Sequence, residues 1–395
     1  MKILLITHKP IFPLIDGGCI AMKEFMQNLL HLDFEIQNIS ISTSKHPFDL
    51  NEYPEEIQKS VQPESVFINT KVNPLKAIQA LIKGESYNVS RFYSSDFEKL
   101  ILEKIKNSTF DFILLESAFL LPYLPAIRKN FSGKVLVRTH NVEYKIWERM
   151  ASFEKNFLKK KYLQKLAKDL KNYEIQHLKK VDGLICISDL DKRTFQTHGI
   201  YIPMVTIPVS MKVNDAFKFD GNSKDIFFLG AMNWQPNVEA VESLLKDIFP
   251  KIRTKFPQTK LHLAGSYMSS KLTNLKQENV VVHGRIKDVN QFMSAHGILV
   301  VPLKSGSGIR IKILEAMSVA TPVIATSVGF EGIAVLNRIE GIVANSTQEF
   351  YDAICDLIES PELAQAIGQK GQNKILLKYS QEQVSNKLYE FLKSF

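Results

Sequence analysis

The segment Pro302–Ile333, which reads PLKSGSGIRIKILEAMSVATPVIATSVGFEGI, decides the fold of this chain. It follows the apolar run Gly297–Val301, which is typical of a strand buried on both faces. A glycine-rich loop, Ser305–Gly308, comes next, and apolar residues at helical spacing begin at Ile309. Thr321–Pro322 ends this helix before a second strand begins. The order of strand, glycine turn, helix and strand predicts an α/β protein.

The predicted helix carries two cations and a carboxylate, which are Arg310, Lys312 and Glu315. Backbone N–H groups of a glycine loop and of a helix N-terminus favour phosphate, and the two cations add positive charge. A carboxylate can accept hydrogen bonds from vicinal hydroxyls. The pattern therefore favours a phosphate ester of a polyol. On spacing alone, an ordinary glycine-rich turn whose cations face water is an equal alternative.

The same segment resembles the donor-binding part of the retaining glycosyltransferases of family four, and the resemblance continues through Pro322–Gly332. In that family two Glu residues stand at a fixed spacing, and Glu315 matches the second, which holds the nucleotide ribose. Ser307 stands where the first Glu contacts the donor sugar, so this chain departs from the pattern there. It resembles instead a branch with the form Gly-Ser-Gly-x-Arg-x-Lys.

The resemblance implies the GT-B fold, in which two Rossmann-like, doubly wound α/β domains face an interdomain cleft. A length of 395 residues also predicts two domains. We expect an N-terminal acceptor-side domain over residues 1–205 and a C-terminal nucleotide-sugar-binding domain over residues 206–379. Residues 380–395 are expected to form a helix that crosses back to the N-terminal domain, as the resemblance implies.

The composition is that of an ordinary soluble globular protein, with 45% hydrophobic and 23% charged residues. Three cysteines, Cys19, Cys186 and Cys355, are far apart and match no disulfide or metal spacing. No apolar run approaches the roughly 20 residues that a membrane span requires. We therefore expect a cytoplasmic protein, with the inner face of the membrane as an alternative location.

The net charge of +9 is compatible with nucleic acid, an anionic membrane surface or a phosphorylated substrate. No nucleic-acid-binding motif is present, so nucleic acid is not expected as a partner. Positive charge concentrates in Lys155–Lys180, which also has an apolar helical face. A packed helix with a solvated face is the favoured interpretation, and peripheral membrane contact is the alternative.

The N-terminal half begins with a predicted strand at Lys2–Thr7 and a helix at Ala21–Leu32, joined through Gly17 and Gly18. The resemblance implies that this double glycine lies near the donor phosphates. The strand is not followed by a Gly-x-Gly-x-x-Gly motif, which argues against a nicotinamide dehydrogenase.

His140 follows a predicted strand, Lys134–Arg138, where α/β proteins place ligands. The residue could act as a base, donate to a substrate hydroxyl or cap the next helix. The segment around it resembles a family pattern in which a His touches the donor sugar, and this favours a catalytic role for His140. Arg138 is either part of the same group or an ion-pair partner, and the helix dipole alone accounts for Glu143.

Gly230 and Asn233 belong to the turn after a predicted strand at Asp225–Leu229. Many family members carry an Arg and a Lys here that hold the donor diphosphate, and this chain has neither. We therefore expect Arg310 and Lys312 to supply the positive charge for catalysis. Backbone groups near the substrate are expected from Gly308 and Ile309.

Two further candidates, Gly284 and Arg285, lie where the resemblance implies the nucleotide base. His262 and His283 fall within strand patterns and are expected in the core or at the sheet rim. No cluster of metal-binding residues shows the required spacing, so neither a metal nor a cofactor is predicted.

The resemblance implies a retaining, metal-independent glycosyltransferase that uses a nucleotide diphosphate sugar. The acceptor would be a hydroxyl of a glycan, lipid-linked or protein-linked, in bacterial cell-surface polysaccharide or glycoconjugate biosynthesis. Two alternatives stay open. One is a GT-B epimerase or hydrolase of nucleotide sugars, and the other is a non-catalytic nucleotide-sugar-binding protein, which the Ser307 departure would favour.

Overall fold

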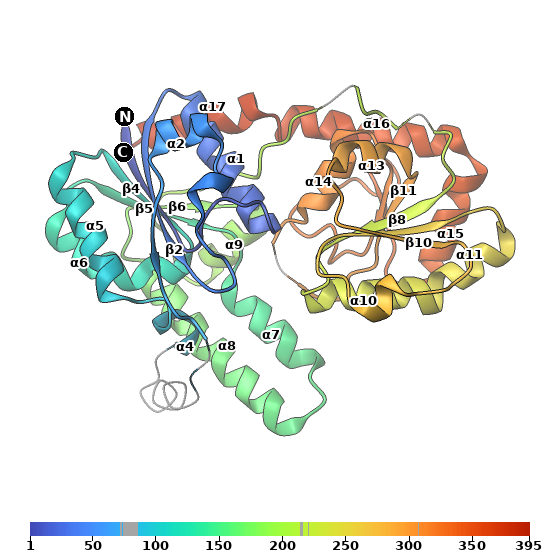
Figure 1. Ribbon diagram of the computed structural model, residues 1–395, viewed down its shortest axis with the longest axis horizontal. Coiled ribbons are helices and arrows are strands. Elements are labelled where there is room, and N and C mark those ends of the chain that lie inside the picture. The colour runs from blue at the N-terminus through green and yellow to red at the C-terminus, as the bar shows by residue number, and fades with distance from the viewer. Residues whose placement is uncertain (72, 74–85, 214–215, 220, 307) are drawn as a thin grey trace. The chain divides into compact units, whose positions relative to one another are not determined.

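The computed structural model describes residues 1–71, 73, 86–213, 216–219, 221–306 and 308–395, so the candidate Ser307 lies outside the described residues. The chain divides into two compact units (Figure 1). The N-terminal unit comprises Met1–Val209 and Val384–Phe395, and the C-terminal unit comprises Ser210–Gln383. The sequence-based boundaries lie within a few residues of these two divisions.

The N-terminal unit is built on a parallel sheet, which has seven strands in the described part of the chain. Its strands are β1 (Lys2–Thr7), β2 (Glu35–Ser42), β3 (Glu64–Phe67), β4 (Phe112–Glu116), β5 (Lys134–Thr139), β6 (Gly183–Cys186) and β7 (Met204–Thr206). They are ordered β3-β2-β1-β4-β5-β6-β7, and each pairs in parallel with its neighbours. The prediction of a parallel α/β sheet is confirmed here.

Helical segments connect these strands. They are α1 (Gly17–His31), η1 (Leu50–Glu52), α2 (Glu55–Val61), α4 (Tyr87–Ser90), α5 (Ser95–Asn107), η2 (Ala118–Tyr123), α6 (Leu124–Asn130), α7 (Glu143–Phe153), α8 (Phe157–Leu178), α9 (Asp189–Thr197) and α17 (Gln381–Lys393). Helix α1 begins four residues before the predicted start, because Asp16 caps it by accepting from the Cys19 N–H.

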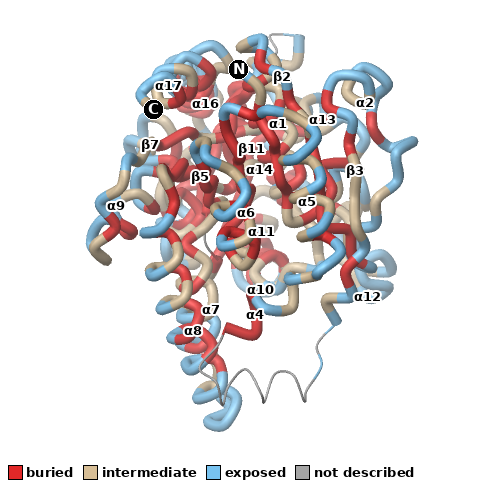
Figure 2. The backbone as a smooth tube through the Cα atoms, turned by 90° about the vertical axis from the view of Figure 1, so that its left-hand side faces the viewer, coloured by how far each residue is buried: buried red, intermediate tan, exposed pale blue. Residues whose placement is uncertain are grey.

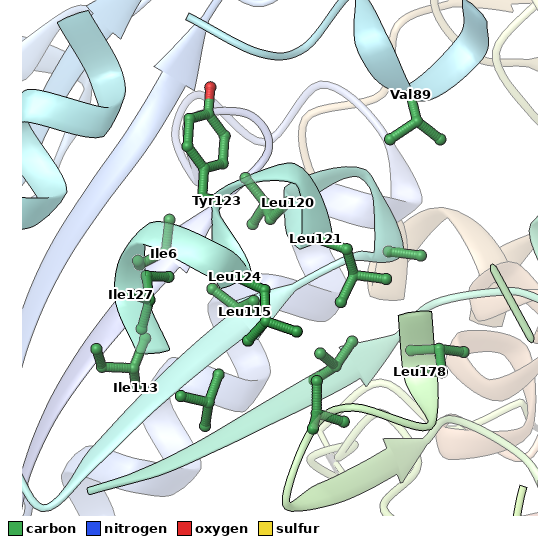
Figure 3. Packing of buried hydrophobic residues seen from close by; sticks show 14 of the residues in the cluster. Ile6, Val89, Ile113, Leu115, Leu120, Leu121, Tyr123, Leu124, Ile127 and Leu178 are labelled. Carbon is green, nitrogen blue, oxygen red and sulfur yellow. The ribbon is translucent and has the colours of Figure 1, made fainter. Parts of the chain in front are cut away.

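The sheet has a separate hydrophobic core on each face, and the side-chain alternation of β1 supplies both. Leu4 and Ile6 belong to one core, and Ile3 and Leu5 to the other. All four side chains are fully buried, which explains why the strand reads as a continuous apolar run. Figure 3 shows Ile6 packed among side chains of β4, η2 and α6 in the first core.

Helix α17 completes the second core. Val384, Leu388 and Leu392 recur at helical spacing and are buried with residues of β1 and α1. The chain end also packs closely, since a Cβ on Gly183 would lie 2.5 Å from the Phe395 ring.

Helices α7 and α8 lie against each other (Figures 1 and 2). Helix α8 accounts for the predicted basic helix, and Leu163, Leu166 and Leu170 form its buried face. Phe157 and Leu158, at the start of the helix, are 68% and 77% exposed and do not belong to that face. Among the described residues, no helix has both the length and the apolar character needed to cross a bilayer.

The C-terminal unit repeats the plan with a smaller parallel sheet, six-stranded in the part that the structure describes. Its strands are β8 (Ile226–Leu229), β9 (Leu261–Ala264), β10 (Val280–Gly284), β11 (Ile298–Val301), β12 (Val323–Ala325) and β13 (Ile342–Val343). The order is β10-β9-β8-β11-β12-β13. The predicted apolar strand before the opening segment is therefore β11, which is completely buried.

Its helical segments are α10 (Gln235–Ser243), the π-helical turn η3 (Leu244–Ile248), α11 (Phe249–Lys255), α12 (Ser270–Thr273), α13 (Val289–Ala295), α14 (Ile311–Ser318), α15 (Thr347–Glu359) and α16 (Pro361–Lys378). Helix α14 begins later than its apolar spacing predicts. Arg310 occupies the N-cap position with φ −86° and ψ 93°, so it precedes the helix.

Candidate functional site

The strand order of the N-terminal unit brings polar residues together at the carboxyl ends of three adjacent strands. Strands β1 and β4 are neighbours, and the chain leaves them toward opposite edges of the sheet. Such a switch point is where open α/β sheets bind ligands. His8 follows β1, Glu116 ends β4 and His140 follows β5.

Glu116 is the centre of this group and is completely buried. Arg138 Nη1 donates to its two carboxylate oxygens at 3.0 and 3.2 Å, and His140 Nε2 lies 2.6 Å from Oε2. Burial alone would raise the pKa of Glu116, but Arg138 and His140 outweigh it and lower the pKa. The carboxylate is thus ionised, and Arg138 is an ion-pair partner within the sheet.

His140 is a neutral ring in this environment. Burial lowers its pKa, and the opposing effect of Glu116 does not restore it. Because an ionised carboxylate only accepts, the ring proton lies on Nε2, which makes Nδ1 an acceptor nitrogen. His8 lies beside it, with ring centroids 5.9 Å apart, and its Nδ1 is 2.7 Å from the Glu116 carbonyl oxygen.

The backbone at the end of β4 is strained. Ser117 has φ +124°, a backbone conformation that residues other than glycine rarely adopt. Such outliers cluster at functional sites because surrounding structure holds them in place. Ser117 follows Glu116 directly, so the strain lies within the polar group.

Gly17 and Gly18 open α1 next to a charged network. Lys9 Nζ binds both Asp16 oxygens at 2.7 and 2.8 Å, and His46 Nε2 is 3.1 Å from Asp16 Oδ2. Despite burial, these contacts lower the pKa of Asp16. A Cβ on Gly18 would lie 2.7 Å from Lys9 Nζ, so glycine leaves room for the lysine.

Glu143 has a different environment from the one the helix dipole predicts. Burial raises its pKa to about 7. Its backbone N–H and that of Tyr144 donate to the buried Glu174, each at 3.3 Å. Glu174 therefore caps the first turn of α7 by accepting from its N–H groups. Burial disfavours the ionised form of the Glu143 carboxyl.

In the C-terminal unit, Lys312 is held over the turn that follows β8. Its Nζ donates to Asn237 Oδ1 at 2.9 Å, and Asn237 Nδ2 donates to the Ala231 carbonyl at 2.9 Å. Nζ also lies 4.2 Å from the centroid of the Phe228 ring. A Cβ on Gly230 would lie 2.7 Å from both Lys312 Nζ and Asn237 Nδ2, which explains the glycine.

Arg310 is almost completely buried, with 4% of its surface exposed. Its Nη1 donates to the Gly308 carbonyl, and its Nη2 is 4.0 Å from Glu331 Oε2. The guanidinium carbon lies 5.9 Å from the ring centroid of Trp234, so that side chain packs beside Arg310. Gly306, at φ +121°, allows the close approach of these two side chains.

The two cations influence each other. Burial and the Arg310 charge lower the pKa of Lys312 to about 7, and Glu315 on the next turn of α14 opposes the shift. Gly308, with φ +78°, and the half-buried Ile309 complete the loop before Arg310. An anion placed here would stabilise the protonated lysine.

Three predicted residues lie at or after the carboxyl ends of β8 and β10, the two strands on either side of β9. Asn233 and Arg285 are exposed, and Gly284 has φ +68° with open space where a Cβ would stand. Backbone hydrogen bonds join these turns. The Gly230 N–H donates to the Ala264 carbonyl at 2.9 Å, and the Gly265 N–H donates to the Gly284 carbonyl at 2.7 Å.

Sequence reasoning missed several of these partners. Glu116 ends one apolar strand in the sequence and His8 follows another, and both are far from His140 along the chain. They are close to His140 in space because β1, β4 and β5 are adjacent in the sheet. Asn237 could have been found, because an Asn in the first turn of a helix after a glycine turn is a common backbone partner.

Sequence reasoning also missed a histidine cluster. His262, His283 and His296 each offer a ring nitrogen within 4.8 Å of the others. The sequence predicts that His262 and His283 are core or rim residues and not ligands. His262 is buried and His283 is exposed, but nothing in the sequence indicates that they cluster with His296. Their separations along the chain fit no common ligand spacing, because neighbouring parallel strands bring them together.

Comparison with known proteins gives a family match for part of the chain. Residues 223–360 match the family model described as glycosyl transferases group 1. An uncharacterized 44.6 kDa protein in the cps region of Klebsiella pneumoniae is 26% identical over 256 residues, 62% of this chain and 64% of the relative. An uncharacterized glycosyltransferase of Methanocaldococcus jannaschii is 26% identical over 200 residues, 48% of this chain and 54% of the relative. The chain thus matches less than two thirds of either relative's length.

Solved structures match over nearly the whole chain. The S. aureus protein TarM, in complex with fondaparinux, α-GlcNAc-glycerol and UDP, has TM-score 0.71 and 13% identity, covering 99% of this chain and 100% of TarM. Anabaena HepE, in complex with UDP-glucose, has TM-score 0.67 and 14% identity, covering 100% of both chains. At these identities the likeness shows the fold, and the predicted two-domain α/β GT-B fold is confirmed. Together with the family match, the comparisons support a glycosyltransferase family.

Proposed function

We propose that this protein transfers a glycosyl unit from a nucleotide diphosphate sugar to an acceptor hydroxyl, with retention of the anomeric configuration. One observation carries the proposal. Arg310 is buried and Lys312 is partly buried where the glycine-rich turn after β11 leads into α14, within the segment that matches glycosyl transferases group 1. A diphosphate would add anionic charge beside these two cations, and it would stabilise them most where water is excluded.

Each residue of the turn has a proposed role. Arg310, Lys312 and the N–H groups of Gly308 and Ile309 would bind the diphosphate and stabilise the charge that develops on it as the leaving group. Glu315 would accept hydrogen bonds from the ribose. Ser307 is proposed to face the donor sugar. These cations would replace the metal ion that many nucleotide-sugar enzymes use, so the proposed reaction needs neither a metal nor a cofactor.

The remaining candidates would bind the ends of the donor. Gly284 and Arg285 are proposed to contact the base, mainly through backbone groups, and Gly230 and Asn233 to line the diphosphate. In the N-terminal unit, His140 is proposed to contact the reacting sugar, oriented by Glu116 at 2.6 Å. The N–H groups of Gly17 and Gly18 would approach the donor phosphates.

The donor and acceptor classes follow from the proteins that this chain resembles. TarM and HepE were solved with UDP or UDP-glucose, so UDP sugars are the first donors to test. The Klebsiella relative belongs to a cps region, which supports an acceptor in bacterial cell-surface polysaccharide, either a free or a lipid-linked glycan.

A thermal-shift screen with UDP, GDP, ADP and their sugars tests the donor site. A nucleotide at 100 times its Kd stabilises the protein by about 2.7 kcal/mol, which raises the melting temperature measurably. We expect one base to give a shift that Arg310→Ala abolishes. Arg253→Ala, a partly exposed arginine of the same unit, is the control and should leave the shift intact. If no nucleotide shifts wild type, the donor-site assignment fails.

Turnover separates transfer from its two alternatives. A transferase releases nucleoside diphosphate in proportion to glycosylated acceptor, and proton NMR of the product should show the donor's anomeric configuration. Donor consumption without acceptor would identify an epimerase or hydrolase. Binding without turnover for any acceptor tested would identify a non-catalytic protein. Activity that EDTA abolishes would contradict a metal-independent reaction.

A peripheral membrane contact is proposed for the junction of α7 and α8. Met150, Phe153, Phe157 and Leu158 are 48%, 62%, 68% and 77% exposed there. Nearby lysines on α8 supply charge for an anionic surface. This location at the inner membrane face would suit a lipid-linked acceptor.

Vesicle sedimentation tests the contact with phosphatidylglycerol-containing liposomes. Inserting one Phe or Leu side chain contributes about 1.5–3 kcal/mol, so Phe157→Ser with Leu158→Ser should reduce partitioning at least roughly tenfold. Phe67→Ser, which removes a similarly exposed ring elsewhere, is the control. Equal partitioning of both variants would exclude this junction as the membrane contact.

A further inference from the structure

Three histidines lie on one face of the C-terminal sheet, next to α13. His262 belongs to β9, His283 to β10, and His296 directly follows α13. Phe292 of α13 contacts two of the rings, with centroids 5.1 Å from His283 and 4.2 Å from His296. One ring nitrogen of each histidine lies within 4.8 Å of the other two. None of the three has a role in the proposed sugar transfer.

His262 is oriented by a carboxylate. Its Nε2 lies 3.0 Å from Asp225 Oδ2, and its Nδ1 lies 2.8 Å from His283 Nε2. A carboxylate accepts, so it places the ring proton of His262 on Nε2. The Nδ1 lone pair of His262 then accepts from His283 Nε2, so an ion bound here would replace that hydrogen bond. Carboxylates orient metal-binding histidines in this way.

His296 is oriented by a backbone carbonyl. Its Nδ1 lies 2.7 Å from the carbonyl oxygen of Phe292, four residues earlier, and a carbonyl can only accept. The proton therefore lies on Nδ1, and Nε2 carries the lone pair. Two of the three rings are thus fixed, by groups outside the cluster, in the tautomer that leaves one nitrogen for an ion.

We propose that His262, His283 and His296 form a binding site for a divalent transition-metal ion, with Zn²⁺ the best match. Zinc–imidazole bonds of about 2.0–2.1 Å in tetrahedral geometry place ligand nitrogens about 3.3–3.4 Å apart. The observed separations, from 2.8 Å up to at most 4.8 Å, lie on both sides of that value. The farthest pair would have to approach by up to about 1.4 Å, the difference between 4.8 and 3.4 Å, to reach it.

The surroundings fit a divalent transition-metal ion in a partly open site. Three imidazoles suit zinc, copper or nickel, whereas Mg²⁺ and Ca²⁺ prefer oxygen ligands. His283 is exposed, so water can complete the coordination.

Metal titration of the full-length, untagged protein after dialysis against EDTA tests the site. Wild type should bind one Zn²⁺ per chain, and Co²⁺ in its place should give the strong visible absorption of tetrahedral coordination. His283→Gln should abolish the Co²⁺ spectrum and weaken Zn²⁺ at least tenfold, because it removes a ligand at an exposed position. Asp225→Asn keeps all three ligands and should weaken Zn²⁺ by roughly ten- to a hundredfold.

His31→Gln, an exposed histidine of the N-terminal unit, is the matched control and should bind Zn²⁺ as wild type does. Thermal melting of each variant without metal shows whether it is folded. The proposal is overturned if untagged wild type binds no Zn²⁺, if His283→Gln binds it equally well, or if Mg²⁺ competes at similar concentration. Because the readout is metal binding, failure of this site leaves the proposed sugar transfer unaffected, and the reverse also holds.

Discussion

Both units have charged side chains near the carboxyl ends of their strands, but the two groups differ in how closely a carboxylate contacts the basic residues. In the N-terminal unit, Glu116 lies between Arg138 and His140, and the buried charges compensate one another. In the C-terminal unit, Arg310 and Lys312 are two neighbouring cations. Lys312 donates to the neutral Asn237, and the Glu331 carboxylate is 4.0 Å from Arg310. The carboxylate of the first group is in direct contact with its cation, whereas the carboxylate of the second is farther away, so an added anion should stabilise the second group more.

The largest expected effect comes from removing the anion of the N-terminal group. Glu116→Ala would leave the fully buried Arg138 without its carboxylate. Breaking a buried pair by deleting one partner costs about 3–5 kcal/mol of stability. We expect the free energy of unfolding to fall by that amount, measured by urea denaturation of the full chain.

The double variant Glu116→Leu with Arg138→Met sharpens this prediction. It replaces both charges by apolar groups, and such replacements are often neutral or stabilising. We expect most of the lost stability to return. If the single and double variants are equally unstable, charge compensation is not what Glu116 contributes.

A second effect, on turnover, is expected at His140. His140→Gln removes the ring that we propose contacts the sugar, and loss of one such hydrogen bond costs about 1.5–3 kcal/mol, or roughly ten- to a hundredfold in kcat/KM. Nucleotide affinity, which we assign mainly to Arg310 and Lys312, should stay unchanged. His177→Gln, a partly buried histidine on α8, is the control. Equal activity of the two variants would remove His140 from the site.

The third effect is a pH dependence of nucleotide binding, set by Lys312. Its pKa of about 7 lies below the usual value for lysine, because of burial and Arg310. A bound diphosphate would raise that pKa, so binding takes up a proton and affinity falls by up to about tenfold per unit above pH 7. Calorimetric titration with the preferred nucleotide sugar between pH 7 and 8.5 measures this slope.

Lys312→Met should bind weakly and show no such slope. The same pKa affects the free protein with a definite sign. Between about pH 7 and the ordinary lysine pKa, the unfolded chain binds more protons than the folded one, so Lys312 makes stability rise with pH. Wild-type affinity that does not change over the tested range would show that Lys312 is protonated throughout or lies away from the diphosphate.

The sequence predicted the elements better than the contacts among them. The first strand, Lys2–Thr7, coincides with β1 because its residues are buried on both faces and leave a continuous apolar run. The start of α14 was misplaced, because Ile309 continues the apolar spacing although the helix begins only after Arg310. The spacing of apolar residues indicates which face of a helix is buried. It does not indicate the backbone angles that decide where the helix begins.

The candidate sites divide in the same way. Arg310 and Lys312 are close in sequence, so their shared turn was predictable from one segment. The partner of His140 was not, since Glu116 comes from another strand and ends an apolar run. The strand order that joins them depends on packing over the whole unit. Local motifs therefore predicted the C-terminal group well and the N-terminal group only in part.

The smallest expected effect concerns two glycines, one in each unit, that leave room for the end of a nearby lysine side chain. A Cβ on Gly230 would lie 2.7 Å from Lys312 Nζ, and a Cβ on Gly18 would lie 2.7 Å from Lys9 Nζ. A lysine end can move away cheaply, so Gly18→Ala should change the melting temperature little. Gly230→Ala should lower the melting temperature more, because its Cβ would also lie 2.7 Å from Nδ2 of the buried Asn237. Gly230→Ala should also weaken nucleotide binding by up to roughly tenfold, because it displaces one charge-assisted hydrogen bond.

Gly18→Ala is the comparison for that measurement, because it keeps the backbone N–H that we propose approaches the donor phosphates. The displaced Lys9 belongs to a pair with Asp16 that is already neutralised within the N-terminal unit, so nucleotide affinity should change less than for Gly230→Ala. Calorimetry of both variants with the same nucleotide decides the point. A larger loss in Gly18→Ala would reverse the comparison, because the charge that holds the diphosphate would then depend on Lys9 more than on Lys312.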